Sequence, residues 1–140
     1  MQDNIGRESS KDNDLFFTCS LIDYIARKTK NTRMDVVNTL GKKRIEKIYD
    51  LANLYDLTIE EIYDLADVYH SDNIDRVSDD FIVESGMKEG NFDNVKACGY
   101  AIPSHWDIGK VYKRLIKGVA DREKTGVIDA LFHVYNSFVS

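Results

Sequence analysis

A pentapeptide, IYDLA, occurs twice in the sequence, at residues 48–52 and 62–66. The copies are offset by 14 residues, and residues on both sides of them also match. Fourteen residues of α-helix fall only about 40° short of whole turns, so both copies can place their apolar residues on one helical face. The repeat therefore predicts helical structure here. A tandem duplication in phase with the helix is structurally tolerable and need not carry a function.

We expect the two copies to lie in separate helices, at residues 42–55 and 59–70. Thr58 and Glu61 form the pattern T-x-x-E, a capping box in which each side chain bonds a free backbone N–H group. One continuous helix is the alternative, because the repeat keeps its phase.

Apolar residues recur at helical spacing along the rest of the chain, and no strong period-2 alternation is present. Further helices are predicted at residues 14–29, 33–40, 72–86, 106–120 and 127–138. Gly41 suits a helix end, and Ser104 with Asp107 suits a helix start. The residues predicted to point inward from 33–40 and 106–120 are Met34, Val37, Leu40, Ile108, Val111, Tyr112, Leu115 and Val119.

These patterns predict an all-α fold, a compact bundle of six to seven short helices around a single core. Residues 1–12 are polar and are expected to be a disordered N-terminal tail, followed by a single helical domain over residues 13–140. The segment at residues 87–103 is expected to be mainly a loop, anchored by Val95, Cys98, Tyr100 and Ile102.

The bulk composition fits a globular protein that needs no disulfide support. Of the 140 residues, 43% are hydrophobic and only two are cysteines, Cys19 and Cys98. No basic flank with an apolar core begins the chain, and no stretch reaches the roughly 20 apolar residues of a membrane span. We therefore expect a cytoplasmic protein that does not enter the membrane.

Charge is distributed unevenly around a net charge of −5. Residues 27–47 carry +6, residues 48–93 carry −11, and residues 96–124 carry +4. A solvated surface is the simplest interpretation. The alternation could also pair segments within the fold, or present an acidic face to a basic partner.

No motif for catalysis, metal binding or a cofactor is present. His70, His105 and His133 lie far apart, and none has a partner at metal-ligand spacing. The acidic residues 71–84 lack the alternating oxygen ligands and the glycine of a calcium loop. We therefore expect no catalytic residues, no metal and no cofactor, and treat enzyme activity as an open question.

Two alternative functions have identifiable residues. A DNA-binding regulator could use the basic residues of 33–47, which are Arg33, Lys42, Lys43, Arg44 and Lys47. The strongly acidic helix predicted at 59–70 would repel DNA, so nucleic acid is not the expected partner. A small hydrolase or transferase could be built around His105, Trp106 and Asp107, although the pattern of this stretch is more typical of a helix start.

An acidic and aromatic face is the best candidate for an interface with another protein. Tyr49 and Tyr63 follow the inward Ile48 and Ile62, so they lie at the margin of the apolar stripe. Tyrosine is common at the edges of both cores and interfaces. The predicted partner-binding residues are Tyr49, Tyr63, Asp64, Asp67, Tyr69 and His70.

The stretches LFFTCSLIDYIARKTKN, TRMDVVNTLG and IYDLADVYHSDNIDRVSDDFI, with the later AIPSHWDIGKVYKRLI and VYNSF, resemble a group of small uncharacterised all-helical bacterial proteins, a domain-of-unknown-function family. The resemblance covers most of residues 15–138. Such proteins are similar to partners encoded beside predicted ADP-ribosyltransferase-like proteins. The chain departs from the group by carrying two IYDLA elements, where the group has one. Members of the group continue past the VYNSF-like stretch with a polar, Tyr-rich tail.

The resemblance implies an antitoxin-like or accessory role beside a neighbouring effector enzyme. From it and from the acidic face, we expect a protein–protein interaction module. The partner would be another protein, such as an ADP-ribosyltransferase-like effector. Its identity and the oligomeric state do not follow from the sequence.

Overall fold

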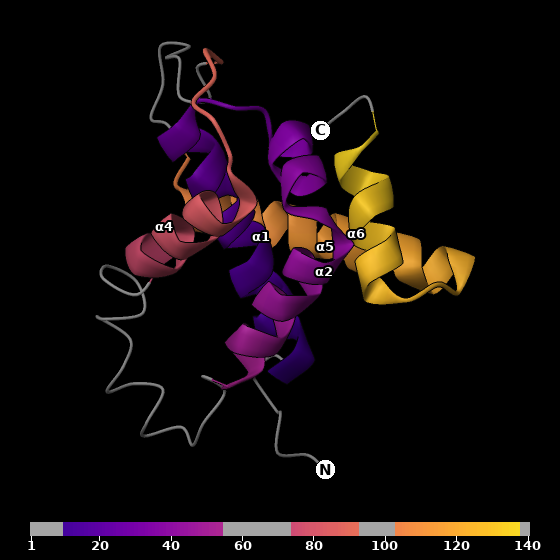
Figure 1. Ribbon diagram of the computed structural model, residues 1–140. Helices are drawn as coiled ribbons and strands as arrows, with labels where there is room; N and C mark the ends of the chain where they lie inside the picture. The colour runs from indigo at the N-terminus through magenta and orange to yellow at the C-terminus, as the bar shows by residue number, and fades with distance from the viewer. Residues whose placement is uncertain (1–9, 55–73, 93–102, 138–140) are drawn as a thin grey trace.

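The computed structural model describes residues 10–54, 74–92 and 103–137 (Figure 1). These residues form five α-helices and no strand, so the predicted all-α class is confirmed. The helices are α1 (Ser10–Thr29), α2 (Arg33–Leu54), α4 (Ile74–Ser85), α5 (His105–Glu123) and α6 (Val127–Tyr135).

The described part thus holds five helices rather than six to seven. The helix predicted at 59–70 lies outside the described residues. The two helices predicted at 33–40 and 42–55 form one element, α2, which bends at Gly41. Gly41 has a φ of 81° and a ψ of 166°, a conformation that a residue without a Cβ adopts readily. The predicted break is therefore present as a kink.

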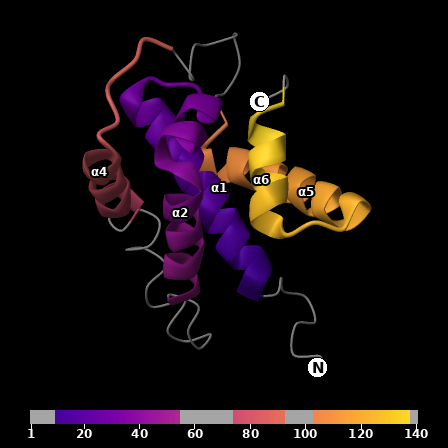
Figure 2. The same ribbon diagram turned by 45° about the vertical axis from the view of Figure 1, so that its right-hand side comes forward.

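Helix α1 is the centre of the fold. It packs against α2, α4 and α5 (Figures 1 and 2), and even its polar Thr18, Ser20 and Asp23 have no exposed surface. A helix that is apolar over most of its circumference is expected to be buried. α1 begins at Ser10 rather than at residue 14, so its first residues belong to the stretch predicted as a tail.

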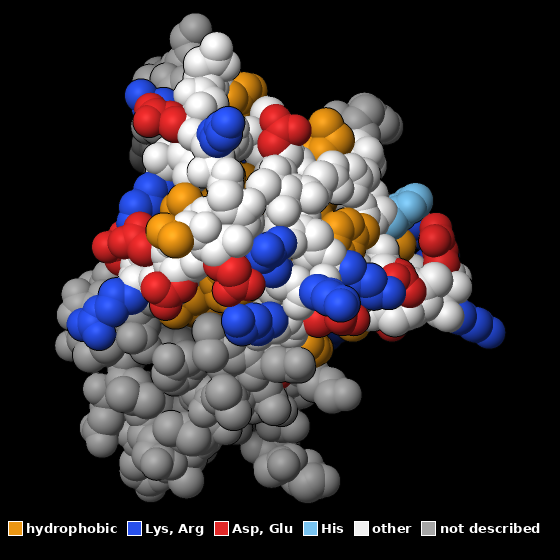
Figure 3. All heavy atoms as spheres, in the orientation of Figure 1, with side chains coloured by type: hydrophobic (Ala, Val, Ile, Leu, Met, Phe, Trp, Pro, Cys, Tyr) orange, Lys and Arg blue, Asp and Glu red, His pale blue; other side chains and the backbone are white. Residues whose placement is uncertain are grey.

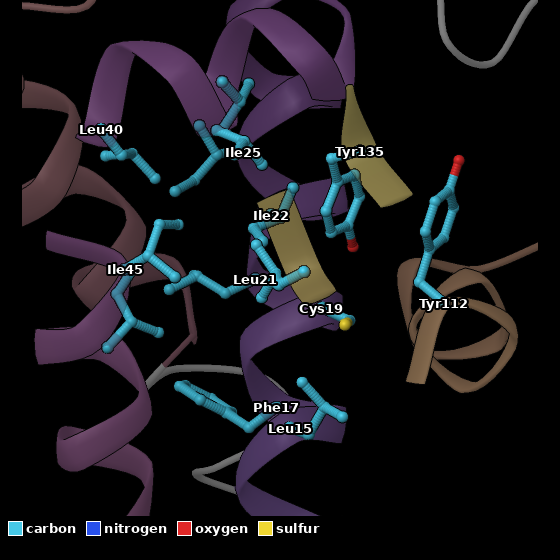
Figure 4. Close-up of a cluster of buried hydrophobic side chains, with 14 of the residues drawn as sticks. Leu15, Phe17, Cys19, Leu21, Ile22, Ile25, Leu40, Ile45, Tyr112 and Tyr135 are labelled. Atoms are coloured by element: carbon cyan, nitrogen blue, oxygen red, sulfur yellow. The ribbon is translucent and has the colours of Figure 1, made fainter. Parts of the chain in front are cut away.

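The core is one cluster formed by α1 and the inner faces of the other helices. Leu21, Ile22 and Ile25 of α1 meet Leu40 and Ile45 of α2 in its interior (Figure 4). On α2 the prediction for Met34 is wrong, because Met34 is 39% exposed and Val36 is buried in its place.

Helix α5 begins with the predicted capping box, but the face that it buries differs from the predicted one. Ser104 Oγ accepts from the Asp107 N–H, and the Asp107 carboxylate accepts from the Ser104 N–H, both at 3.1 Å, which completes the capping box. Tyr112 is buried as expected, but Val111 and Leu115 are 49% and 45% exposed. The buried residues are Gly109, Tyr112, Lys113, Ile116 and Ala120.

Gly109 explains the orientation of α5. A Cβ at this position would lie 2.1 Å from Ser20 Oγ and 2.9 Å from the Ser20 backbone nitrogen. The missing side chain lets α5 cross α1 closely there. The buried face that contains Gly109 is offset by one residue from the predicted face, and one residue of helix corresponds to a rotation of about 100°. With Gly109 at the contact with α1, Val111 and Leu115 therefore point outward.

The end of α1 is closed by a segment far away in the sequence. The Gly90 N–H donates to Thr29 O at 2.8 Å, and the Phe92 N–H donates to Lys30 O at 2.9 Å. Asn31 Nδ2 donates to Lys88 O at 2.9 Å. These bonds satisfy carbonyl groups that a helix end leaves without intrahelical partners, and they fix residues 88–92 across α1.

Candidate functional site

Of the predicted interface residues, the described part of the chain contains only Tyr49. Its ring is half-buried on α2 and packs against the core, so its placement at the margin of the apolar stripe is as expected. The remaining five, which are Tyr63, Asp64, Asp67, Tyr69 and His70, lie outside the described residues. Partner binding by these six residues, Tyr49 included, therefore stays a prediction.

Tyr49 borders an open hollow of about 390 Å³ between α2 and the start of α6. Lys42 and Glu46 line it from α2, and residues 126–129 line it from α6. Lys42 Nζ lies 3.3 Å from Asp129 Oδ1 across the hollow. A tyrosine ring beside one cation and two carboxylates offers stacking and hydrogen bonding to a partner side chain.

The most buried charge in the described residues belongs to Asp23 of α1. Arg27 Nε lies 2.7 Å from its Oδ2, and Arg33 Nε lies 2.8 Å from its Oδ1. Arg33 also stands 5.3 Å from the ring centroid of Tyr112, and Arg27 donates to the carbonyl of Pro103. Burial of a carboxylate is tolerated when it is paired and hydrogen-bonded. This cluster therefore joins α1, α2 and α5.

A second cluster joins α1 to α4. Lys28 Nζ lies 2.6 Å from both Asp75 Oδ1 and Asp79 Oδ1, and the Tyr24 hydroxyl donates to Asp75 Oδ1 at 2.7 Å. The hydrogen bonds from Lys28 and then Tyr24 lower the pKa of Asp75. Burial, with the hydrogen bond to Asp75 and its charge, raises the pKa of Tyr24 to about 12.

The same cluster also shifts the pKa of the Lys28 ammonium. Burial acts to lower its pKa, but the hydrogen bonds to Asp75 and Asp79 outweigh burial and raise it. The Lys28 ammonium and the Asp75 carboxylate thus stabilise each other in their charged forms.

A third cluster joins α2 to α4. Arg44 Nε and Lys47 Nζ lie 3.2 Å and 3.3 Å from the two oxygens of Glu84. Lys47 also stands 5.7 Å from the ring centroid of Phe81. Figure 3 shows basic and acidic side chains side by side over this face. Part of the basic segment 27–47 is therefore paired with residues 75–89 of the acidic segment. Pairing of segments within the fold was one of the uses of charge that the sequence left open.

These ion pairs bear on the DNA-binding alternative. Arg33, Lys42, Arg44 and Lys47 each have a carboxylate partner within the described residues. A phosphate would have to compete with those partners. Of the five basic residues considered for DNA, only Lys43 has no ion pair with a described carboxylate.

The candidate enzyme site at residues 105–107 is built into the start of α5. Asp107 serves in the capping box, and the rings of His105 and Trp106 have centroids 4.8 Å apart. Tyr24 meets His105 edge-on at 4.9 Å, and Phe16 meets Trp106 at 5.4 Å. These contacts attach α5 to α1, which is the structural interpretation that the sequence favoured.

Cys19 and Tyr135 form a buried pair beside the stacked ring of Tyr112 (Figure 4). The Tyr112 and Tyr135 rings are 4.5 Å apart and nearly parallel. Burial raises the pKa of the Cys19 thiol to about 12, although the Tyr135 hydroxyl acts against it. Burial and then Cys19 raise the pKa of Tyr135 well above its usual range. A thiol in this state is a poor nucleophile.

Sequence reasoning missed Asp23 and Lys113 as buried charged residues. Asp23 had a usable signal, since an Asp within an apolar run has an Arg four residues later. Lys113 has none, because its burial follows from the rotation of α5. Burial, then Lys117 and Arg114, lower the pKa of Lys113.

Two negative findings concern the described residues alone. They contain no group of three or more His, Cys, Asp or Glu side chains arranged to hold a metal ion. None of their helices combines the length and apolar character needed to span a membrane.

No protein-family model matches the sequence, and no curated protein or solved structure matches it either. The resemblance to small helical bacterial proteins therefore stays a prediction.

Proposed function

We propose that the chain is a protein–protein interaction module of the cytoplasm that acts as an antitoxin-like or accessory partner of an effector enzyme. The observation that supports this best is the position of Tyr49, whose half-buried ring packs against the core and also borders an open hollow. Amphipathic aromatic side chains at such edges are typical interface residues.

We infer the class of partner from the charge of the predicted contact face and from the family resemblance. The predicted contact face, with Asp64 and Asp67 beside its tyrosines, is acidic. An ADP-ribosyltransferase-like enzyme holds its anionic ligand in a basic cleft. An acidic face could occlude such a cleft, and complementary charge would steer the encounter.

The test is affinity purification of the tagged chain from its native cell, with mass spectrometry and size-exclusion chromatography of the product. One stoichiometric protein partner, a nucleotide-dependent transferase, is the expected result. The double variant Asp64→Lys with Asp67→Lys should lose that partner while its melting temperature is unchanged.

The matched control is Asp80→Lys with Asp121→Lys, which makes the same change in charge at two exposed residues. It should keep the partner. Retention of the partner by the Asp64 and Asp67 variant would exclude the acidic face. A monomer that elutes alone would exclude the function.

A further inference from the structure

The outer face of α5 carries an apolar strip that no described helix covers. Among the described helices α5 packs along α1 and α6, and α2 reaches it through Arg33, which stands over the buried ring of Tyr112. Val111 and Leu115, one helical turn apart, are 49% and 45% exposed. Two aliphatic side chains at this spacing form the ridge that one helix offers to the groove of another.

Gly118 lies one turn beyond Leu115 on the same face. Nothing in the described part of the chain lies within 4 Å of the place where its Cβ would be, so no contact there explains a glycine. Gly in the interior of a helix lowers its stability relative to Ala. A glycine beside an exposed apolar ridge allows the backbone of a second element to approach closely.

Basic residues lie on the adjoining side of the strip. They differ from the basic residues of α2 in their ion pairing. Lys110 and Arg114 are exposed, and neither has an ion pair with a carboxylate in the described part of the chain. Arg44, Lys47 and Lys42, by contrast, have described carboxylate partners. Between residues 110 and 117 the helix has no acidic residue. No described carboxylate thus neutralises the positive charge of Lys110 and Arg114, and this charge would favour a partner that carries carboxylates.

We propose that this face of α5 binds an amphipathic helix of a partner protein, one with an apolar stripe bordered by Asp or Glu. The stripe packs on Val111 and Leu115, the helix backbone approaches at Gly118, and the carboxylates pair with Lys110 and Arg114. Helix binding through an apolar face with charges at its edge is a common recognition mode. The inference rests on the proposed protein-binding function and adds a second surface to it.

A membrane surface fits this face less well. Helices that lie in the membrane interface use a broad apolar face that includes Trp or Phe, whereas this strip presents two aliphatic side chains. Nucleic acid also fits this face less well. The affinity of a protein for nucleic acid comes mainly from contacts with phosphates, and an exposed Val and Leu beside a glycine make no such contact.

The test measures fluorescence anisotropy of two labelled helical peptides of about 20 residues with the full chain. One peptide has a Leu stripe bordered by Glu, and the other has Lys in place of every Glu. We expect the Glu peptide to bind at least about tenfold tighter than the Lys peptide. The double variant Lys110→Glu with Arg114→Glu should reverse this preference.

Gly118→Gln separates binding from folding. It should raise the melting temperature, because Gln is the better helix former, and weaken the Glu peptide about tenfold by blocking close approach. A merely structural role for Gly118 would leave the affinity unchanged.

Three results would overturn the proposal. They are equal or absent binding of the two peptides, an unchanged affinity in Gly118→Gln, and binding to phosphatidylserine vesicles or duplex DNA in place of the Glu peptide. If the native partner of the chain is captured while the peptides fail, only the α5 surface is excluded and the proposed function stands.

Discussion

Arg33 Nε lies 2.8 Å from Oδ1 of Asp23, a carboxylate that has no exposed surface. Arg33 is the first residue of α2, and Asp23 lies in the central helix. The pair therefore fixes the beginning of one helix to the middle of another.

Asp23→Ala should lower the free energy of unfolding by about 3 kcal/mol, the lower part of the range for a broken buried ion pair. The lower part applies because the side chains of Arg27 and Arg33 are 22% and 20% exposed and can reach solvent. Urea unfolding at neutral pH measures the change. Asp80→Ala, at an exposed position, should stay within about 0.5 kcal/mol of wild type. Similar values for the two variants would contradict the structural role of Asp23.

Gly109→Ala and Gly118→Ala should have opposite effects although both lie in α5. At Gly109 a Cβ meets the backbone of Ser20, so overpacking should cost about 1–3 kcal/mol. At Gly118 the space is open, so Ala should add up to about 1 kcal/mol through its helix propensity. Thermal unfolding followed by circular dichroism compares them. Stabilisation by Gly109→Ala would show that α1 and α5 cross less closely.

Asp75 should contribute to stability only above the acid range. Its pKa in the folded protein is lowered from 3.8 by the hydrogen bonds from Lys28 and Tyr24, so protons bind the unfolded chain more readily. Its contribution is present above about pH 4 and is lost as the pH falls through the folded pKa. Asp75→Asn should therefore be less stable than wild type near pH 6, with the difference shrinking toward about pH 3. In urea unfolding, a difference between Asp75→Asn and wild type that stays constant from about pH 6 to about pH 3 would contradict this assignment.

Cys19 should resist thiol reagents in the folded protein. It is fully buried, and burial raises its pKa to about 12, so almost no thiolate is present at about pH 8. In a Cys98→Ser background, labelling by a colorimetric disulfide reagent should need denaturant. Complete labelling within minutes in native buffer would mean that α1 and α6 separate readily.

Local signals predicted the helix ends well. Ser104 and Asp107 form the expected capping box, and Gly41 bends the chain where a break was expected. These features depend on residues three or four apart, so the sequence contains all the information that they need.

The orientation of α5 could not be predicted in the same way. Its apolar residues fit either of two faces about 100° apart, and the choice depends on the fit of Gly109 to Ser20, which lies 89 residues earlier. The burial of Asp23 likewise depends on Arg33 arriving from α2. Of the residues predicted to bind a partner, only Tyr49 is described, and it is half-buried at the edge of the core; its role in binding stays a prediction.

The hydrogen bonds from the Gly90 and Phe92 amides to the end of α1 should also slow the hydrogen exchange of these amides. Both amides lie outside any helix, where hydrogen exchange is ordinarily fast. Here each amide can reach deuterium only after a contact spanning about sixty residues of chain has opened. Their protection factors should therefore follow the separation of α4 from α1 rather than fraying of a loop. Two backbone protons in an irregular segment would then record how often the contact between α1 and the segment after α4 opens.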